Sequence, residues 1–416
     1  MTGAGRRRRL ARALALTLLA AMTQGPVAIA EDAALGERAR TLVGDGQGVY
    51  VEDEKGEVLV SQAATRAVHP ASVSKVATTL ALLRELGPEH RFATRFLGAG
   101  RVDDGVLHGD LVVESEGDPY FVDENALLVT LALHDAGIRR VTGHLVVQGP
   151  LVFNWKTDGA PARLRRALEG GVSGEAWAAV RAARGLGDGP APAIGFGGDA
   201  PARGERAAPS ADPPRTLVVH RSLPLVPLVK ALNGFSNNVF HAFAGRVGGV
   251  ARVQEIARAS VPPALREEIV LENGAGAGAT NRLSPRAAVA IHRALHEELA
   301  RHGLELDDVL PVSGIDPGTL RERLDGPGER GRVVGKTGTY GDYGASALAG
   351  AIRSEARGLV YFAVLNRGVP VPEARPRQDA FVRALLAAEP GPVWTAPRDT
   401  TPAFTRARVE LADSAP

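Results

Sequence analysis

The sequence predicts a mixed α/β (α+β) fold, because runs with the period of a strand and runs with the period of a helix follow one another. Residues 48–51 and 57–61 are β-branched and apolar runs around a turn at 53–56, the pattern of a hairpin. From Ser72, apolar residues recur at helical spacing to about Leu86, where Gly87 and Pro88 end the helix. This helix is apolar nearly all round, so we expect it to be buried in the middle of its domain.

The rest of the chain continues this mixture. Residues 96–150 are strand-rich, with one helix at 125–136, and residues 223–244 are helical with a break at 233–238. Further predicted elements are helices at 285–302, 318–324 and 378–388 and strands at 333–339, 348–352 and 359–365.

Composition excludes several classes of function. The net charge is only +2 and no basic stripe is interleaved with aromatic residues, so nucleic acid is not an expected partner. The chain has no cysteine, which excludes disulfides, thiolate chemistry and cysteine-ligated zinc. The ten histidines are scattered and form no His-Glu-x-x-His, so we expect neither a metal nor a cofactor.

The first thirty residues have the three parts of a secretory signal. Arginines at 6–9 precede a short apolar run at 13–22, and Ala28-Ile-Ala30 fits a cleavage site. The apolar run is short for a membrane span, and no later segment is long and apolar enough for one. We therefore expect residues 1–30 to be removed and the mature protein to be soluble in the periplasm; an uncleaved N-terminal helix or anchor is the alternative.

The chain has only five lysines: Lys55, Lys75, Lys156, Lys230 and Lys336. Two of them, Lys75 and Lys336, lie in motifs that suggest catalysis. A retained lysine is a candidate for work that arginine cannot do, because a buried lysine can lose its proton. Ser72 and Lys75 are three residues apart on a helix, so their side chains can touch. Ser-x-x-Lys is typical of serine acyl-transfer enzymes that use lysine as the base, although the pattern also occurs by chance.

Two further motifs supply polar groups. Lys336-Thr-Gly338 ends an apolar strand, where Gly338 lets a substrate backbone approach closely. Lys336 and Thr337 can bind a substrate carboxylate. The Thr339 N–H can act together with the Ser72 N–H as a donor to the oxyanion. Ser236-Asn-Asn238 places a hydroxyl and an amide in one tight loop between helices. Taken singly, the first is equally compatible with a solvated turn and the second with a polar turn or a helix N-cap.

Together and in this order, the three motifs resemble those of the D-alanyl-D-alanine carboxypeptidase/endopeptidase family of the penicillin-binding protein 4 type. The likeness extends beyond them, roughly from residue 48 to residue 386. The similar blocks are residues 70–79, 86–88, 92–94, 117–119, 138–143, 310–314, 318–320 and 348–350.

The resemblance implies a role for each matching residue. Ser72 is the acylated nucleophile and Lys75 its base, while Ser236 joins the proton relay with Lys336. The implied substrate-binding residues are Asn238 for an amide, Lys336 and Thr337 for the terminal carboxylate, Gly338 for close approach and Thr339 for the oxyanion hole. The implied partners are peptidoglycan stem peptides and cross-links, with β-lactams as covalent inhibitors.

The resemblance also implies a transpeptidase/β-lactamase-like domain, with a central five-stranded antiparallel sheet flanked by helices. We expect this domain to be discontinuous, at 31–95 and 217–396, around a strand-rich inserted subdomain at 96–216. Within the insertion, residues 185–215 are rich in Gly, Ala and Pro and predict a flexible stretch. Residues 397–416 predict a loose tail.

The chain departs from the family pattern in the length of its insertion, which is short for this family and implies that one inserted subdomain is reduced or absent, and at two positions. Gly274-Ala-Gly276 stands where relatives often have Gly-Ser-Gly, and Gln148 stands where an acidic residue often engages the amine of a diamino-acid stem. Two other functions remain open at this point. One is a β-lactamase or esterase, for which we find no deacylating base; the other is a non-catalytic envelope binding module, which need not retain Ser72, Lys75 and Lys336.

Overall fold

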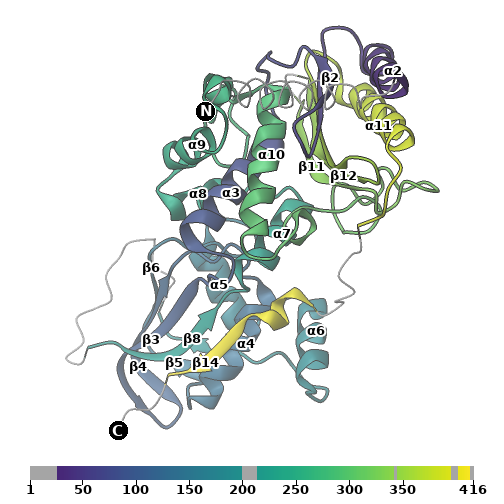
Figure 1. Ribbon diagram of the computed structural model, residues 1–416. Helices are drawn as coiled ribbons and strands as arrows, with labels where there is room; N and C mark the ends of the chain where they lie inside the picture. The colour runs from purple at the N-terminus through teal and green to yellow at the C-terminus, as the bar shows by residue number, and fades with distance from the viewer. Residues whose placement is uncertain (1–25, 199–212, 342–343, 395–401, 413–416) are drawn as a thin grey trace, which may run out of the picture.

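The computed structural model describes residues 26–198, 213–341, 344–394 and 402–412. These residues form two sheet-centred parts, which Figure 1 shows in the upper and the lower half of the molecule. Most of the predicted signal segment (residues 1–25) and most of the second half of the predicted flexible stretch (199–212) lie outside the described residues.

The first part contains a five-stranded antiparallel sheet in the order β11-β12-β13-β1-β2, which confirms the predicted central sheet. Its strands are β1 (Gly48–Asp53), β2 (Val58–Gln62), β11 (Val333–Tyr340), β12 (Ala345–Ser354) and β13 (Gly358–Asn366). The hairpin β1–β2 and the three C-terminal strands lie where the alternating runs predict them. β11 is an edge strand, so one row of its backbone groups is turned away from the sheet.

Helices cover both faces of this sheet because alternate residues of its strands are apolar on both sides. On β13, Phe362 and Val364 pack in a cluster with Phe381 of the last helix, whereas Ala363 and Leu365 belong to the cluster of the central helices. The outer face carries α2 (Pro26–Val43) and α11 (Val371–Ala388), and the inner face carries α3 (Lys75–Leu86) and α10 (Pro285–Ala300) (Figure 1).

The predicted central helix is confirmed in position and in burial. A 3₁₀ turn, η1 (Ala71–Ser74), leads into α3, and every residue from Lys75 to Leu83 is buried. Gly87 ends the helix with φ +80° and donates its N–H to the carbonyl of Leu83. The helices and short strands that surround α3 are α7 (Leu225–Gly234), α8 (Phe240–Ala244), η2 (Gly245–Val247), α9 (Val250–Ala259), η3 (Pro263–Glu268), β9 (Ile269–Val270), β10 (Arg282–Leu283) and η4 (Leu306–Asp308).

The second part is built on a seven-stranded sheet in the order β14-β8-β3-β4-β5-β7, with β6 also paired to β4. Its strands are β3 (Ala93–Asp103), β4 (Val106–Ser115), β5 (Arg140–Val141), β6 (Leu145–Gln148), β7 (Gly195–Phe196), β8 (Arg215–Arg221) and β14 (Arg408–Leu411). The helices α4 (Asp123–Asp135), α5 (Ala160–Leu168) and α6 (Gly174–Arg184) complete it, and its core is separate from that of the first part. Gln148 is exposed at the end of β6.

The structure corrects several sequence-based boundaries. The predicted loose tail at 397–416 contains η6 (Ala403–Arg406) and β14, which pairs with β8 (yellow beside teal in Figure 1), because Phe404 is buried and anchors it. The predicted subdomain limits, 96 and 216, fall inside β3 and β8. The described half of the 185–215 stretch holds β7, with Ile194 in the core. Residues 318–324 form turns rather than a helix.

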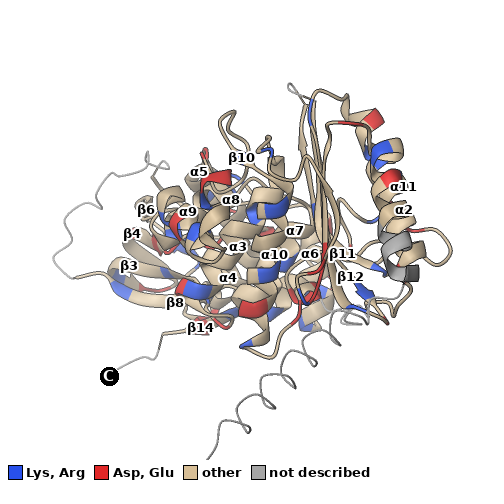
Figure 2. Cartoon of the chain, turned by 45° about the horizontal axis from the view of Figure 1, so that its top comes forward, with Lys and Arg blue, Asp and Glu red and all other residues tan. Residues whose placement is uncertain are grey.

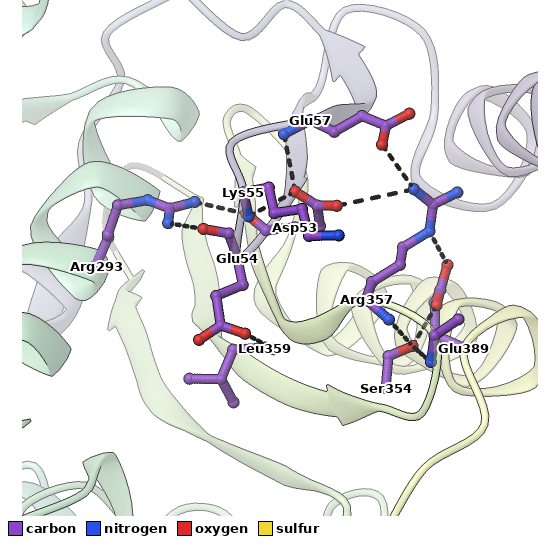
Figure 3. Close-up of polar contacts among 10 residues, drawn as sticks. Asp53, Glu54, Lys55, Glu57, Arg293, Ser354, Arg357, Leu359 and Glu389 are labelled. Carbon is purple, nitrogen blue, oxygen red and sulfur yellow. Dashed lines mark hydrogen bonds and ion pairs between the residues drawn. The ribbon is translucent and has the colours of Figure 1, made fainter. Parts of the chain in front are cut away.

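At the end of the five-stranded sheet that holds the β1–β2 and β12–β13 turns, one arginine pairs with three carboxylates. Figure 3 shows Arg357, from the β12–β13 turn, reaching toward Asp53, Glu57 and Glu389. The Glu389 carboxylate lies 3.1 Å from Arg357 and also accepts from the Ser354 hydroxyl at 2.7 Å. This ion cluster ties the β1–β2 hairpin to the C-terminal end of α11.

Charged residues of both signs are interspersed over the helices and strands drawn in Figure 2. In α3 they stand at its two ends, as Lys75 at the start and Arg84 and Glu85 in the last turn. Among the described residues, no helix is long and apolar enough to cross a membrane.

Candidate active site

Ser72 and Lys75 are in contact at the start of the central helix. The Lys75 ammonium lies 2.6 Å from the Ser72 hydroxyl oxygen, which confirms the contact expected from their spacing. Ser72 is half-buried and Lys75 is fully buried. Just before them, Ala71 has φ +47°, an unfavourable conformation for a residue with a side chain, which indicates that the surroundings hold this turn in place.

Lys75 is buried among neutral partners. Its ammonium donates to Asn238 Oδ1 at 3.2 Å and to the carbonyl of Ala275 at 2.7 Å, besides Ser72. In the described part of the chain, it has no ion pair with a carboxylate. Burial therefore lowers the pKa of Lys75 from 10.5 to about 7. At neutral pH a large fraction of Lys75 is an uncharged amine that can accept a proton.

The loop that contains Ala275 is fixed by its own hydrogen bonds. Asn273 Oδ1 accepts from the N–H groups of Ala275 and Ala277, at 2.9 and 3.1 Å. Gly276 has φ +75°, and a Cβ there would lie 2.0 Å from the carbonyl oxygen of Ala71. Sequence reasoning noted this glycine-rich segment only as a departure from the family pattern. It missed the Ala275 carbonyl because a backbone ligand leaves no signature in residue type.

The Ser236-Asn-Asn238 segment forms the turn between α7 and α8, as predicted. Ser236 has φ +54° and is half-buried. Asn233, at the end of α7, is fully buried and donates to the Thr79 hydroxyl at 3.1 Å and to the Val309 carbonyl at 3.0 Å. This asparagine thereby fixes the turn against the central helix.

Lys336 is turned toward Ser236 rather than toward solvent. Its side chain is fully buried, and its ammonium donates to Ser236 Oγ at 2.9 Å and to the Thr337 carbonyl at 2.8 Å. Burial, together with the nearby charge of Lys75, holds the pKa of Lys336 well below its usual value. The structure therefore joins two predicted residues, Ser236 and Lys336, in one hydrogen-bonded pair.

The outer edge of β11 presents backbone groups to Ser72. The carbonyl of Val333 and the N–H of Gly335 bond residues outside the sheet, so the alternation of a strand also turns the N–H groups of Thr337 and Thr339 outward. Gly338 is packed against the turn before Ser72, since a Cβ on it would lie 2.6 Å from the carbonyl oxygen of Pro70. Gly338 is thus needed for the strand to approach Ser72 closely.

These groups border a cavity of about 900 Å³. Five predicted residues line it: Ser72, Ser236, Asn238, Thr337 and Thr339. Lys75 and Lys336 lie buried beside it. Sequence reasoning did not assign roles to several other lining residues: Thr319, Arg321, Arg323 and Arg375. Thr337 donates its hydroxyl to that of Thr319 at 2.7 Å, and the Gly318-Thr-Leu320 block was the available signal for Thr319.

His69 supports the segment before Ser72 and was also missed. Its Nδ1 accepts from the Ala71 N–H at 3.1 Å, and its Nε2 lies 2.8 Å from the Gly278 carbonyl, so the proton resides on Nε2. The ring stacks on Tyr340 with a centroid separation of 4.3 Å. His69 thus joins the strained Ala71 to the end of β11.

Solved structures with the same fold include a peptidoglycan endopeptidase and a penicillin-binding protein. A predatory peptidoglycan endopeptidase from Bdellovibrio bacteriovorus matches with a TM-score of 0.73 and 20% identity over 88% of this chain and 99% of that one. Penicillin-binding protein 4 from Haemophilus influenzae matches with a TM-score of 0.61 and 17% identity over 84% of this chain and 98% of that one. These likenesses confirm the predicted fold class.

The family model of the D-Ala-D-Ala carboxypeptidase 3 (S13) family matches residues 32–154 and 204–388. The matched residues include all three motifs, from the Ser72 turn to Lys336-Thr-Gly338. The chain belongs to the D-Ala-D-Ala carboxypeptidase 3 (S13) family of serine hydrolases, as the motifs predicted.

Proposed function

We propose that the protein is a penicillin-sensitive D-Ala-D-Ala carboxypeptidase/endopeptidase that acts on peptidoglycan stem peptides and cross-links through an acyl-enzyme on Ser72. The observation that carries this proposal is the 2.6 Å contact between Ser72 Oγ and Lys75 Nζ, in a site that lowers the lysine pKa to about 7. A base with a pKa near the working pH is the most effective proton acceptor for a serine hydroxyl.

In the first step, Ser72 Oγ attacks the carbonyl carbon of the penultimate D-alanine and transfers its proton to Lys75. The new ammonium charge is shared between Asn238 Oδ1 and the Ala275 carbonyl, both already within hydrogen-bond distance. The negative charge that forms on the substrate oxygen is stabilised by the N–H groups of Ser72 and Thr339.

In the second step, the peptide C–N bond breaks and the leaving amine takes the proton that Lys75 accepted from Ser72. The Ser236–Lys336 pair supplies a path for that proton, because its two groups are 2.9 Å apart and Ser236 lines the cavity. Water then attacks the Ser72 ester, which releases the acyl peptide and restores the hydroxyl.

The relatives support the substrate class. One has been solved as the penicillin G-acylated form of the Bdellovibrio endopeptidase, which matches this chain with 20% identity and a TM-score of 0.71. A peptidoglycan substrate and the signal-like N-terminus together support the periplasm as the place of action.

Labelling with a fluorescent penicillin tests the proposal. We expect one covalent adduct on the wild type, mapped to Ser72 by mass spectrometry, and none on Ser72→Ala with an unchanged circular dichroism spectrum. An adduct that persists in Ser72→Ala would contradict the choice of nucleophile. No adduct on folded wild type would favour a non-catalytic binding module.

Release of D-alanine from a disaccharide pentapeptide, and cleavage of a cross-linked muropeptide dimer, test the peptidase activity directly. We expect both products to depend on Ser72. Rapid hydrolysis of the penicillin adduct without release of D-alanine would identify a β-lactamase instead.

A further inference from the structure

Arg375 brings a positive charge to the cavity from a part of the chain that none of the three motifs includes. It lies in the first turns of α11, is exposed, and donates its guanidinium Nη2 to Thr339 Oγ1 at 3.0 Å. Thr337 and Thr339 are two residues apart on β11, so their side chains share the face that α11 covers. Arg375 and the two threonines all line the cavity.

The other cations around the cavity already have partners. Arg323 is paired with Asp379 at 2.6 Å and bonds the Gln378 side chain, while Arg321 donates to the Ile315 carbonyl at 2.6 Å. The Lys336 ammonium is buried against Ser236. The acidic groups on the same wall are Glu322 and Asp379. Within the described residues neither Arg321 nor Arg375 has an ion pair, and of these two arginines Arg375 is the one that contacts a cavity hydroxyl, that of Thr339.

We propose that Arg375, with the Thr337 and Thr339 hydroxyls, binds the free α-carboxylate of the residue that leaves the scissile bond. A planar guanidinium forms two parallel hydrogen bonds to a carboxylate, which fixes both its position and its orientation. This assignment moves the main carboxylate contact from Lys336, which the motif alone suggested, to a residue of the C-terminal helix. It rests on the proposed peptidase function.

The same recognition extends to cross-links. The leaving group of a terminal D-Ala-D-Ala bond and that of a D-Ala cross-link to the D-centre of a diamino diacid both carry an α-carboxylate beside the amine. Arg375 therefore selects the chemistry next to the scissile bond rather than the length of the leaving group. The cavity of about 900 Å³ leaves room for more than one alanine.

The test compares an N-acylated D-Ala-D-Ala peptide with its C-terminal carboxamide as substrates of the wild type, Arg375→Ala, Arg375→Lys and two controls. Arg377→Ala removes an exposed charge two residues away that is paired with Glu373 at 3.2 Å. Arg321→Ala removes another arginine of the cavity wall. We expect Arg375→Ala to lower kcat/KM for the acid about 10- to 100-fold, the value of a charged hydrogen bond, and to change that for the carboxamide less than about threefold.

Arg375→Lys is expected to fall between the wild type and Arg375→Ala, and both controls to keep the wild-type ratio of acid to carboxamide. An active wild type whose ratio is unchanged in Arg375→Ala overturns the role of Arg375. An equal fall of this ratio in Arg377→Ala, or a fall in Arg321→Ala alone, also overturns the role of Arg375. A wild type that neither cleaves the acid nor reacts with penicillin contradicts the proposed function itself, so the two failures are distinguishable.

Discussion

Two regions of the first part bury cations in opposite ways. At the far end of the sheet, the Arg357 guanidinium is shared among three carboxylates, Asp53, Glu57 and Glu389 (Figure 3). At the cavity, Lys75 and Lys336 are completely buried, and their hydrogen-bond partners among the described residues are hydroxyl, amide and carbonyl oxygens. Both regions remove positive charge from water, but within the part of the chain that the structure describes only the first supplies negative charge in return.

The difference separates a structural cation from a reactive one. A buried arginine keeps its proton, so it must be neutralised by partners, whereas a buried lysine can lose its proton instead. Lys230 shows that residue type alone does not decide the matter. It pairs with Asp316 at 2.5 Å and bonds two backbone carbonyls, and it therefore belongs with Arg357 as a structural cation.

The largest expected effect comes from giving the reactive site a cation that cannot lose its proton. Lys75→Arg should lower the second-order rate of acylation by penicillin about 10³-fold, because it removes the proposed general base. Stopped-flow labelling measures this rate. Lys55→Arg, in the exposed hairpin turn, should react like the wild type. Acylation of Lys75→Arg within tenfold of the wild-type rate would show that Lys75 is not the base.

The converse change should affect folding and leave chemistry intact. Arg357→Ala leaves the carboxylates of Asp53 and Glu389 buried without their cation, so we expect a loss of about 3 kcal/mol in the free energy of unfolding. Urea denaturation measures this loss. Arg101→Ala, which removes the exposed Arg101–Asp103 ion pair, should lower the free energy of unfolding by less than about 1 kcal/mol. Folded Arg357→Ala should be acylated at the wild-type rate; a slower rate would mean that the two regions are coupled.

The sequence predicted the reactive region better than the structural one. Ser72, Lys75 and Lys336 could be identified because chemistry requires fixed residue types at fixed spacing, and helical periodicity placed the first two in contact. The Ala275 carbonyl and the His69 support could not, since the first is a backbone group and the second depends on tertiary packing. Arg375 is one of many arginines, and only the packing of α11 on β11 brings it to the cavity.

The sheet and its C-terminal strands were predictable because alternating apolar residues encode them locally. The tail was not: β14 is short and half-polar, and it becomes a strand only because the edge of β8, far away in sequence, accepts it. The Arg357 cluster was equally hidden, since its partners come from a hairpin, a turn and the end of a helix.

The pH dependence of acylation examines the reactive region without any mutation. Protonated Lys75 cannot accept the Ser72 proton, so the rate should fall about tenfold for each pH unit below the lysine pKa of about 7 and level off above it. Measurement between pH 5 and 9, with tryptophan fluorescence as a check of folding, gives the profile. A rate that is constant from pH 5 to 7 would contradict a lysine base with this pKa.

The smallest expected effect is on stability and follows from the same lowered pKa. Between the folded pKa of about 7 and the unfolded value near 10.5, the unfolded chain binds more protons at Lys75, so rising pH favours the folded state. From pH 7.5 to 8.5 the wild type should therefore gain about 1 kcal/mol relative to Lys75→Met, which has no such proton. Urea denaturation at both pH values measures this difference, and Lys55→Met, which removes an exposed lysine, should show no such change. An equal stability difference between wild type and Lys75→Met at the two pH values would mean that the folded site keeps Lys75 charged, and the contrast with Arg357 would then be one of geometry rather than of protonation.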